Sequence, residues 1–585
     1  MLDIPVLIVG GGPVGLTASL LLSKHGVRSL LVERHPGIAI VPKARGINAR
    51  TMEMYNQCGI DAAIRAAGLS EERRGRLIVW TETLAGSEIG RRVRGRTTPK
   101  NMSVTPITDC LCAQDDLEPV IRRFAEAAGP GELRFNTELI SFSQQAGGVT
   151  GTMTNRLTGE AMTLSARYLI AADGAQSRVR RALGVQMAGE EKVYDSVNIL
   201  FNADLRQWTE HRPAALYFVE QPELRGTFLT INGTDRWGFL IHSLSQYGYR
   251  PGDLTPERCT ALIRQAVGIP ELPVSVLGVS FWEASAIVAD HYRHGAVFLA
   301  GDAAHEMPPT GGFGLNTGVQ DVHNLAWKMA AVLHGQADEA LLDSYHAERR
   351  PLAETITRAA LANAMSMGRT KRQSGAVLPR PEFLNDQGLI FGLCYESMAV
   401  IPHGTPPVEV ADPVTEYEPS ARPGSRAPHV WLQRDGEQLS TIDLFGAHFT
   451  LLAGRDGDAW REALHQTEPT WPPLIGFTIG KEGDLIDPDG NWHQTYGVET
   501  DGAVMVRPDG YVAWRKRSGT SEPREVLRAV FDDLLGNIRH RLRALPRIAT
   551  TLRRHEAFVN VRLCDDCDSL VPGRALSQSI VPNLA

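Results

Sequence analysis

Three glycines near the N-terminus, Gly10, Gly12 and Gly15, constrain the fold of this chain more than any other feature. They form a Gly-x-Gly-x-x-Gly turn between an apolar run at residues 4–9 and a helix-like segment at residues 13–25, and a second apolar run ends at Glu33. A strand, a helix and a second strand within about 30 residues form the unit from which parallel sheets are built. The pattern therefore predicts an α/β fold that begins with a Rossmann-like unit.

The same turn is suited to binding a pyrophosphate. Glycine lets the backbone turn tightly and approach an anion, while the start of the helix at Pro13 presents free N–H groups and a positive dipole end. Glu33, 18 positions after Gly15, can accept hydrogen bonds from ribose hydroxyls. We predict a dinucleotide site, with a purely structural glycine turn as the alternative. The turn alone does not distinguish NAD from FAD.

Two later motifs favour FAD. The first runs from Asp173 to Arg180 as Asp-Gly-Ala-Gln-Ser-Arg-Val-Arg, and the second is Gly-Asp-Ala-Ala-His at residues 301–305; each follows an apolar run that we predict to be a strand. An acid at the end of a strand, beside small residues, can approach a ribityl hydroxyl. The Pro- and Gly-rich segment 307–318 then leads into a helix, and its backbone N–H groups can point at the anionic region of a reduced flavin.

In this order, the three motifs resemble those of the single-component FAD-dependent aromatic hydroxylases, the family of para-hydroxybenzoate hydroxylase and phenol hydroxylase. The resemblance covers about residues 3–365, and segments 43–53 and 112–119 resemble the longer bacterial hydroxylases of phenols and aromatic polyketides. It implies an NAD(P)H-dependent monooxygenase in which NADPH or NADH reduces FAD. The flavin then reacts with O2, and a flavin C4a-hydroperoxide transfers OH to an electron-rich ring of a phenolic or polycyclic substrate.

The resemblance also implies a set of cofactor contacts. These are Gly10, Gly12, Pro13, Gly15, Glu33, Arg34, Arg45, Gln114, Asp173, Asp302, Pro309, Gly312, Gly314, Leu315 and Asn316. Asp173 would lie at the pyrophosphate and NADPH side, and the loop from Pro308 to Asn316 would line the isoalloxazine, which makes Pro308 a catalytic candidate. We expect His305 to support this loop rather than to carry protons.

Candidate substrate residues lie in the strand-rich segment 181–285. His242 and Tyr217 are the catalytic candidates that could contact a substrate hydroxyl, and Trp237, Phe239 and Trp282 could pack on its ring. By the two-residue period of a strand, Trp237 and Phe239 share one face and His242 lies on the other. Ordinary sheet packing is the alternative for all five.

The predicted organisation is a Rossmann-like FAD-binding domain with a β-sheet substrate domain and a C-terminal α/β domain, which from Arg422 onward resembles the thioredoxin-like domain of these hydroxylases. The ranges are 1–180 and 286–370 for the discontinuous FAD-binding domain, 181–285 for the substrate domain, 371–421 for a Pro-rich linker, 422–540 for the thioredoxin-like domain and 541–585 for a tail. Because no Cys-x-x-Cys lies near the first strand of the thioredoxin-like domain, we expect it to be structural or part of a homodimer interface. The Cys564–Cys567 pair is interpreted as free thiols, with a surface redox pair as the alternative. The arginines near the C-terminus are interpreted as a solvated helix face, with an anion-binding patch as the alternative; they are Arg539, Arg541, Arg543, Arg547, Arg553 and Arg554.

Composition excludes some partners. A net charge of −7 argues against nucleic acid, and we predict neither a membrane span nor a metal site. Seven cysteines without a disulfide pattern favour the cytoplasm. Two other functions stay open. A flavin-dependent halogenase would carry Trp-x-Trp-x-Ile-Pro, which the segment at Trp237 lacks, and a non-catalytic flavin- or drug-binding protein would not oxidise NADPH.

Overall fold

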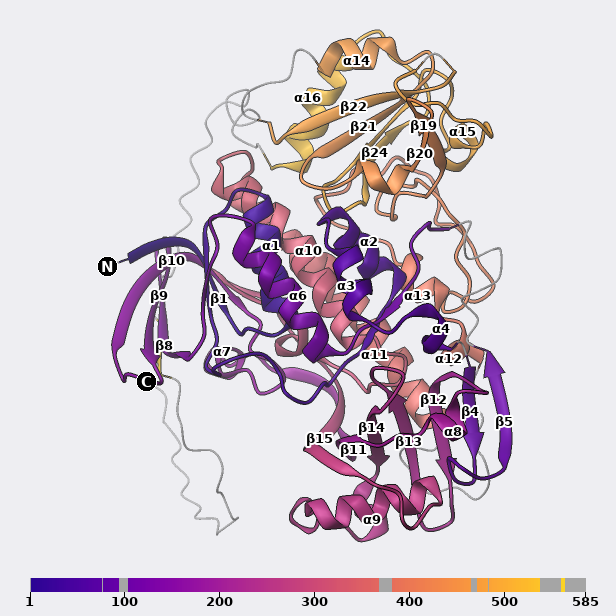
Figure 1. Cartoon of the computed structure of the whole chain (residues 1–585). Helices are drawn as coiled ribbons and strands as arrows, with labels where there is room; N and C mark the ends of the chain where they lie inside the picture. The colour runs from indigo at the N-terminus through magenta and orange to yellow at the C-terminus, as the bar shows by residue number, and fades with distance from the viewer. Residues whose placement is uncertain are drawn as a thin grey trace, which may run out of the picture.

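The computed structural model describes residues 2–75, 77–93, 104–367, 381–464, 471–481, 483–536 and 559–562. Figure 1 shows three regions, with the N-terminal sheet and its helices between a β-rich layer and a smaller α/β unit. None of the helices in these ranges is long and apolar enough to cross a membrane. Cys564, Cys567 and the six arginines interpreted as a helix face lie outside the described residues; these arginines are Arg539, Arg541, Arg543, Arg547, Arg553 and Arg554.

The first sheet confirms the Rossmann-like unit. Strand β1 pairs in parallel with β2 on one side and β10 on the other, and β10 pairs in parallel with β17. Helices α1, α6 and α10 pack side by side against it (Figure 1). The bounds are β1 (Leu2–Val9), α1 (Pro13–Lys24), β2 (Ser29–Val32), α6 (Gln114–Ala127), β7 (Glu132–Arg134), β8 (Thr137–Gln145), β9 (Gly148–Asn155), β10 (Ala161–Ala171), α7 (Arg178–Ala182), β16 (Arg293–His294), β17 (Val297–Leu299), α10 (Gly314–Leu333), α11 (Asp343–Ser366) and β25 (Val559–Arg562).

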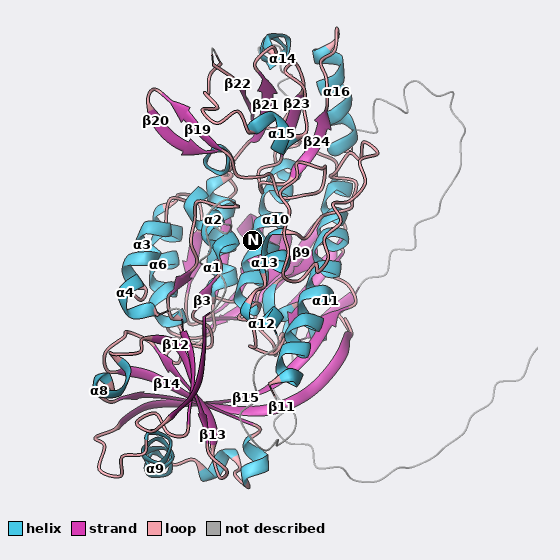
Figure 2. Cartoon of the chain, turned by 90° about the vertical axis from the view of Figure 1, so that its right-hand side faces the viewer, coloured by secondary structure: helices cyan, strands magenta, loops and turns pink. Residues whose placement is uncertain are grey.

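The second sheet is the predicted β layer, and it is mostly antiparallel. Its order is β18-β15-β11-β14-β13-β12-β4-β5, and Figure 2 shows the strands fanning out below the FAD-binding region. The bounds are β4 (Leu77–Thr81), β5 (Glu88–Val93), β11 (Met187–Asn202), β12 (Ala214–Glu220), β13 (Arg225–Thr230), β14 (Arg236–His242), α9 (Pro256–Val267), β15 (Ser275–Ala289) and β18 (His305–Glu306). Residues 77–93 therefore join the substrate sheet, although they fall in the range 1–180 that the sequence assigned to FAD binding.

The C-terminal unit has the predicted thioredoxin-like topology. Its sheet has the order β22-β21-β23-β24, in which β21 is parallel to β22 and antiparallel to β23. The bounds are β19 (Trp431–Arg434), β20 (Glu437–Ser440), β21 (Phe449–Gly454), α14 (Asp458–Leu464), β22 (Leu474–Ile479), α15 (Trp492–Tyr496), β23 (Ala503–Val506), β24 (Val512–Lys516) and α16 (Pro523–Leu534). The unit packs on α10, where Trp327 meets Phe449 with ring centroids 5.5 Å apart.

Short elements connect these regions. They are β3 (Gly46–Ile47), which pairs with β6 (Cys110–Leu111), and the helices α2 (Ala49–Gln57), α3 (Asp61–Ala67), α4 (Glu71–Arg74), α8 (Arg206–Thr209), α12 (Pro381–Leu384) and α13 (Gln387–Phe391). Helices α12 and α13 lie in the predicted linker, and their apolar side chains Phe383, Leu389, Ile390 and Phe391 are buried. This part of the linker is thus packed against the protein.

Candidate active site

In the glycine turn, Gly10 and Gly15 have no room for a side chain, whereas Gly12 borders open space. A Cβ at Gly10, whose φ is +109°, would lie 2.2 Å from the Ala172 carbonyl oxygen, and a Cβ at Gly15 would lie 2.0 Å from the Gly10 carbonyl oxygen. A Cβ at Gly12 would meet nothing within 4 Å. Gly12 is the N-cap of α1 and no side chain caps the helix, so the free N–H groups of its first turn face this space. The space fits the pyrophosphate of a dinucleotide.

Glu33 lies beside this turn at the end of β2. Its Oε2 accepts a hydrogen bond from the Gly11 N–H at 2.6 Å, and its Oε1 accepts one from the His35 N–H at 2.8 Å. The carboxylate is therefore held at the edge of the open space over Gly12, where ribose hydroxyls could replace these donors. The neighbouring Arg34 is exposed, and its Nε lies 3.2 Å from His35 Nε2.

The motif at residues 173–180 stabilises its own turn through Asp173 and contacts the motif at residues 301–305 through Arg180. The Asp173 carboxylate accepts hydrogen bonds from Ser177 Oγ at 2.6 Å and from the Arg178 N–H at 2.9 Å at the start of α7. Arg180, which is buried, donates to the carbonyl oxygens of Ala175 at 2.8 Å and Ala303 at 3.2 Å. Two motifs more than 100 positions apart thus meet at one edge of the sheet.

Asp302 is presented on a tight turn between β17 and β18. Gly301 has a φ of +61°, and its neighbours Ala303, Ala304 and His305 are buried whereas the Asp302 side chain is exposed. The surrounding protein raises the pKa of Asp302 above its ordinary value, while His305 and Lys43 act to lower it. The Asp302 side chain is therefore accessible to a ligand on a turn whose other residues are buried, as a cofactor contact requires.

The loop before α10 is fixed by Asn316. Its Nδ2 donates to the carbonyl oxygens of Gly312 at 2.7 Å and Gly46 at 2.9 Å, and its Oδ1 accepts from the Asn48 N–H at 2.9 Å. Pro308 is buried, Pro309 and Gly312 are exposed, and Gly314 and Leu315 are half-buried at the start of α10. The predicted flavin loop is therefore a fixed turn with part of its backbone accessible.

Arg45 and Gln114, two further predicted FAD contacts, lie close together, because the Gln114 N–H donates to the carbonyl oxygen of Ala44, the residue before Arg45. Arg45 donates to the Thr230 carbonyl oxygen at 2.7 Å and also to that of Ala215, so it ties the segment before β3 to strands β13 and β12 of the second sheet. Gln114 donates from Nε2 to Glu118 Oε1 at 2.7 Å, and its Oε1 accepts from the Lys43 N–H at 3.2 Å. The FAD contacts predicted for both residues stay predictions.

Three of the five substrate candidates are corrected by their position. Trp237 and Phe239 are 2% and 0% exposed in the core between the sheet and α9. Tyr217 is in the same core, and its hydroxyl donates to the Arg212 carbonyl oxygen at 3.0 Å and accepts from the Ala214 N–H at 3.0 Å. Because α9 covers this face and the hydroxyl is satisfied, these side chains serve packing and do not reach a ligand.

His242 and Trp282 lie on the opposite face, as the strand period predicts for His242. Their ring centroids are 6.2 Å apart, and Tyr194 completes an aromatic cluster at 5.4 Å from His242 and 6.1 Å from Trp282. Ser196 Oγ lies 2.8 Å from His242 Nδ1. Both His242 and Trp282 are half-buried, so this face, which we call the inner face, is partly accessible.

The inner face and the flavin loop meet at one turn of α11. Asn363 donates from Nδ2 to the Thr310 carbonyl oxygen at 3.4 Å, and the next residue, Ala364, packs on Tyr194. The inner face also contacts the segment between β2 and β3, because Asn198 Nδ2 donates to the Pro42 carbonyl oxygen at 3.1 Å. The aromatic cluster is therefore separated from the flavin loop by little more than one helical turn.

Comparison with known proteins decides the family. A family model described as an FAD binding domain matches residues 3–360, and one described as the C-terminal part of aromatic-ring hydroxylases matches residues 420–537. The chain belongs to the FAD-dependent aromatic-ring hydroxylases. The hydroxylase is thus a flavoprotein monooxygenase, and the open space over Gly12 and the accessible Asp302 fit FAD.

Its relatives act on aromatic compounds. The hydroxylase is 38% identical over 557 residues to tetracenomycin A2 monooxygenase-dioxygenase of Streptomyces glaucescens, covering 91% of this chain and 97% of the relative. It is 36% identical over 536 residues to 4-methyl-5-nitrocatechol 5-monooxygenase of a Burkholderia species, covering 90% and 96%. A crystal structure of aklavinone-11 hydroxylase with FAD and aklavinone superposes with a TM-score of 0.82 at 36% identity, covering 92% of this chain and 99% of that chain.

The sequence did not point to the buried polar side chains behind the flavin turn of the hydroxylase. Asp321 on α10 and Arg349 on α11 are both fully buried and paired at 2.9 Å, and Asp321 Oδ2 lies 2.8 Å from His305 Nε2. A charged residue in the middle of a long helical segment usually lies on a solvated face. The sequence around Asp321 gave no clear signal, because the polar residues Gln320, His323 and Asn324 lie beside it and suggest a solvated face, although they are buried.

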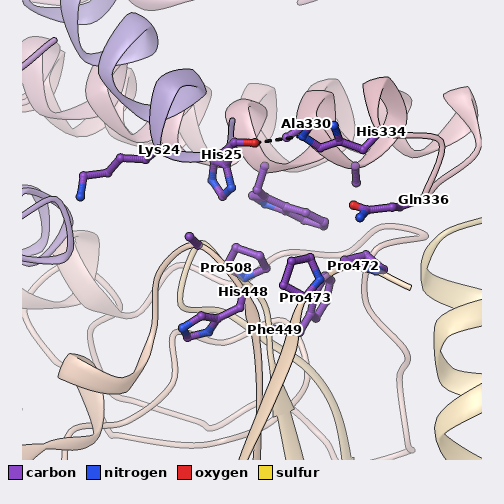
Figure 3. Close-up of a pocket in the computed structure, with 13 residues that line it drawn as sticks. Lys24, His25, Ala330, His334, Gln336, His448, Phe449, Pro472, Pro473 and Pro508 are labelled. Atoms are coloured by element: carbon purple, nitrogen blue, oxygen red, sulfur yellow. Dashed lines mark hydrogen bonds between the residues drawn. The ribbon is translucent and has the colours of Figure 1, made fainter. Parts of the chain in front are cut away.

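A cavity of about 530 Å³ lies elsewhere in the hydroxylase, between the end of α1, α10 and the C-terminal unit. Figure 3 shows His25, His334 and His448 around it, with the His334 ring bonded to the His25 carbonyl oxygen. Burial lowers the pKa of His25 to about 4, and the nearby His334 and Lys24 act in the same direction. This cavity is at the opposite end of α1 from Gly12, so it is not the flavin site.

Proposed function

We propose that the hydroxylase acts on a multi-ring phenol, such as the aromatic core of a polyketide, with electrons from NADPH and an oxygen atom from O2. The observation that carries this proposal is the cluster of Tyr194, His242 and Trp282 on the inner face, one helical turn from the flavin loop. The half-buried rings of His242 and Trp282 lie 6.2 Å apart over the buried Tyr194, and together they present a surface wider than one benzene ring, which suits edge and face contacts with fused rings.

His242 is the proposed base for the substrate hydroxyl. Ser196 Oγ at 2.8 Å from Nδ1 holds the imidazole, which leaves Nε2 to accept the phenolic proton. Removing that proton raises the electron density at the ring carbons ortho and para to the oxygen, so they react more readily with an electrophilic oxygen. Trp282 orients the ring and excludes water, and the buried Tyr194 supports it from behind. Bound FAD supplies hydride acceptance and oxygen activation.

NADPH is proposed to bind transiently at the flavin cleft. The sequence holds a single Gly-x-Gly-x-x-Gly turn, at Gly10, and the proposed FAD pyrophosphate occupies it. A nicotinamide cofactor therefore has no Rossmann turn of its own. We also propose a cytoplasmic location, because the five cysteines in the described part of the chain are free thiols, which suits a reducing compartment.

The test combines turnover with product identification. Purified protein is mixed with NADPH and a panel of single-ring and fused-ring phenols, NADPH absorbance is followed, and products formed under ¹⁸O2 are analysed by mass spectrometry. We expect fused-ring phenols to stimulate NADPH oxidation most and to gain one labelled oxygen atom. A product without labelled oxygen, or stimulation by single-ring phenols alone, would contradict the proposal.

A pair of variants tests the role of the inner face. His242→Ala should lower kcat/KM by about 100-fold, the usual range for loss of an acid–base group. Trp237→Phe, on the face covered by α9, should leave kcat/KM within about threefold while lowering stability by about 1 kcal/mol. Equal losses in both variants would mean that His242 acts through packing of the sheet and not on the substrate.

A further inference from the structure

A single buried carboxylate holds both ends of the turn that carries Asp302. Asp321 is fully buried in α10, and its Oδ2 accepts a hydrogen bond from the Gly301 N–H at 3.1 Å and lies 2.8 Å from His305 Nε2. Its Oδ1 accepts from Arg349 Nε at 2.9 Å. Gly301 begins the turn and His305 follows it, so Asp321 fixes the turn from behind without facing the cofactor space.

The turn fits tightly between two helices. A Cβ on Gly301 would lie 3.0 Å from Val14 Cγ2 of α1, and a Cβ on Gly318 of α10 would lie 2.9 Å from Gly301 Cα. A small shift of the Gly301 backbone would therefore collide with α1 or α10, or would open a gap to them. The position of Asp302 depends on how the turn is held.

Arg349 connects the same carboxylate to the start of α10. It donates from one terminal nitrogen to the Thr317 carbonyl oxygen at 3.2 Å and from the other to the Tyr395 hydroxyl at 3.0 Å. Tyr395 belongs to the predicted linker and stacks on Tyr511 of the C-terminal unit with ring centroids 4.0 Å apart. The linker and the C-terminal unit thus support the flavin turn through one arginine.

The charge on Asp321 is maintained by its surroundings. Burial alone would raise its pKa, but the nearby His305 and Arg349 offset this effect and keep the pKa of Asp321 below its ordinary value. The carboxylate therefore remains an acceptor for all three partners over the working range of pH.

We propose that Asp321 is a positioning residue for the flavin: it holds the Gly301–His305 turn and, through Arg349, the start of α10 in the arrangement that binds FAD, without contacting FAD itself. The sequence gives Asp321 no signature of a cofactor contact, and its full burial keeps it from touching one. Its effect must pass through the backbone of the turn.

The experiment compares Asp321→Asn with Glu348→Gln, and it uses no substrate. Glu348 is a matched control because it is also a fully buried carboxylate between cations on the α10–α11 layer, with Arg507 at 2.6 Å and Lys328 at 2.7 Å, and it makes no bond to the turn. The dissociation constant of FAD is measured on apoprotein by flavin fluorescence, together with the visible absorption bands of bound flavin. Thermal melting of each apoprotein reports the general loss of stability.

We expect Asp321→Asn to weaken FAD binding at least tenfold and to move the flavin absorption bands, because an amide cannot accept from Gly301, His305 and Arg349 together. Glu348→Gln should lose similar thermal stability but bind FAD within about threefold of the parent, with unchanged bands. Unchanged FAD affinity and bands in Asp321→Asn, or an equal loss of affinity in both variants, would overturn the proposal.

A second variant covers the case in which Asp321→Asn does not fold. Arg349→Lys keeps the positive charge beside Asp321 but cannot reach Thr317 and Tyr395 at once. It should weaken FAD binding at least threefold and move the flavin bands in the same direction as Asp321→Asn. Parent-like affinity and bands in a folded Arg349→Lys protein would refute the positioning role.

Discussion

The buried ion cluster around Glu53 gives a quantitative prediction about how the C-terminal unit is attached. Glu53 on α2 is fully buried, and its carboxylate accepts hydrogen bonds from Arg50 at 2.9 Å, from Arg426 at 2.9 Å and from Thr105 Oγ1 at 2.6 Å. Both guanidinium groups are about 1% exposed. Glu53→Gln keeps the shape of the side chain, but it removes the only negative charge in this trio and leaves two buried cations facing an amide.

The expected cost follows from that geometry. Breaking a buried pair by removing one partner costs about 3–5 kcal/mol, because an uncompensated charge stays buried. With a slope of about 3 kcal/mol per M urea, the unfolding midpoint should fall by roughly 1–1.7 M. The assay is urea unfolding followed by tryptophan fluorescence. Since a chain of this size unfolds in more than one step, the first transition is compared.

The control and the pH dependence sharpen this test. Glu126→Gln breaks an exposed pair with Arg122 at 2.8 Å and should cost less than about 0.5 kcal/mol. Burial alone would raise the pKa of Glu53, but Arg426 and Arg50 offset this and hold it below the ordinary value. The stabilisation by Glu53 is therefore fully present above about pH 4.5, its ordinary pKa, and is lost as pH falls through its lower pKa in the folded state, so parent and variant should converge in acid. A midpoint shift as small as that of Glu126→Gln would refute the reasoning.

Three further predictions concern the flavin region. Asp302→Ala should purify without bound flavin, and full FAD occupancy would contradict its assigned role. Gly15→Ala should fail to fold, because its Cβ would lie 2.0 Å from a carbonyl oxygen, whereas Gly12→Ala should fold and bind FAD at least tenfold more weakly; solubility and flavin titration separate the two. Burial raises the pKa of Glu306 to about 7, although Arg180 lowers it, so the folded state holds a proton that the unfolded state releases between about pH 4.5 and 7. Stability is lost as pH rises through that window, and Glu306→Gln should gain roughly 3 kcal/mol over the parent at pH 8 and nothing at pH 4, measured by urea unfolding.

Local sequence pattern was sufficient for the parts of the fold that depend on near neighbours. The glycine turn, the strand before it and Glu33 after it lie within one short unit, so spacing alone predicted their arrangement. Local pattern also predicted a smaller α/β unit near the C-terminus, whereas its thioredoxin-like character was predicted from the resemblance of the segment from Arg422 onward to the longer hydroxylases. Residues 77–93 fall within the range 1–180 predicted for FAD binding, yet β4 pairs with β12 of the substrate sheet, because the pairing of a strand with one far along the chain is not visible in its local sequence.

The candidate site was predictable only in part, and the reason is physical. The two-residue period assigned Trp237 and His242 to opposite faces of β14, but it could not tell which face α9 would cover. That depends on packing between segments far apart in the chain. Asp321 and Arg349 were missed because a helix shows its buried face through apolar residues, and a compensated ion pair on that face does not follow this pattern.

Neighbouring side chains of β14 lie on opposite faces of the sheet, and this alternation bears on how substrate preference can change in this family. Along that strand, one residue belongs to the core beneath α9 and the next borders the place where we propose that substrate lies. Mutations that alter which compound is accepted can therefore accumulate at every second position, while the positions between them are constrained by folding. A library that randomises whole segments would lose most of its members to misfolding, whereas one restricted to alternate positions on β11, β14 and β15 would sample new substrates at little cost to the fold.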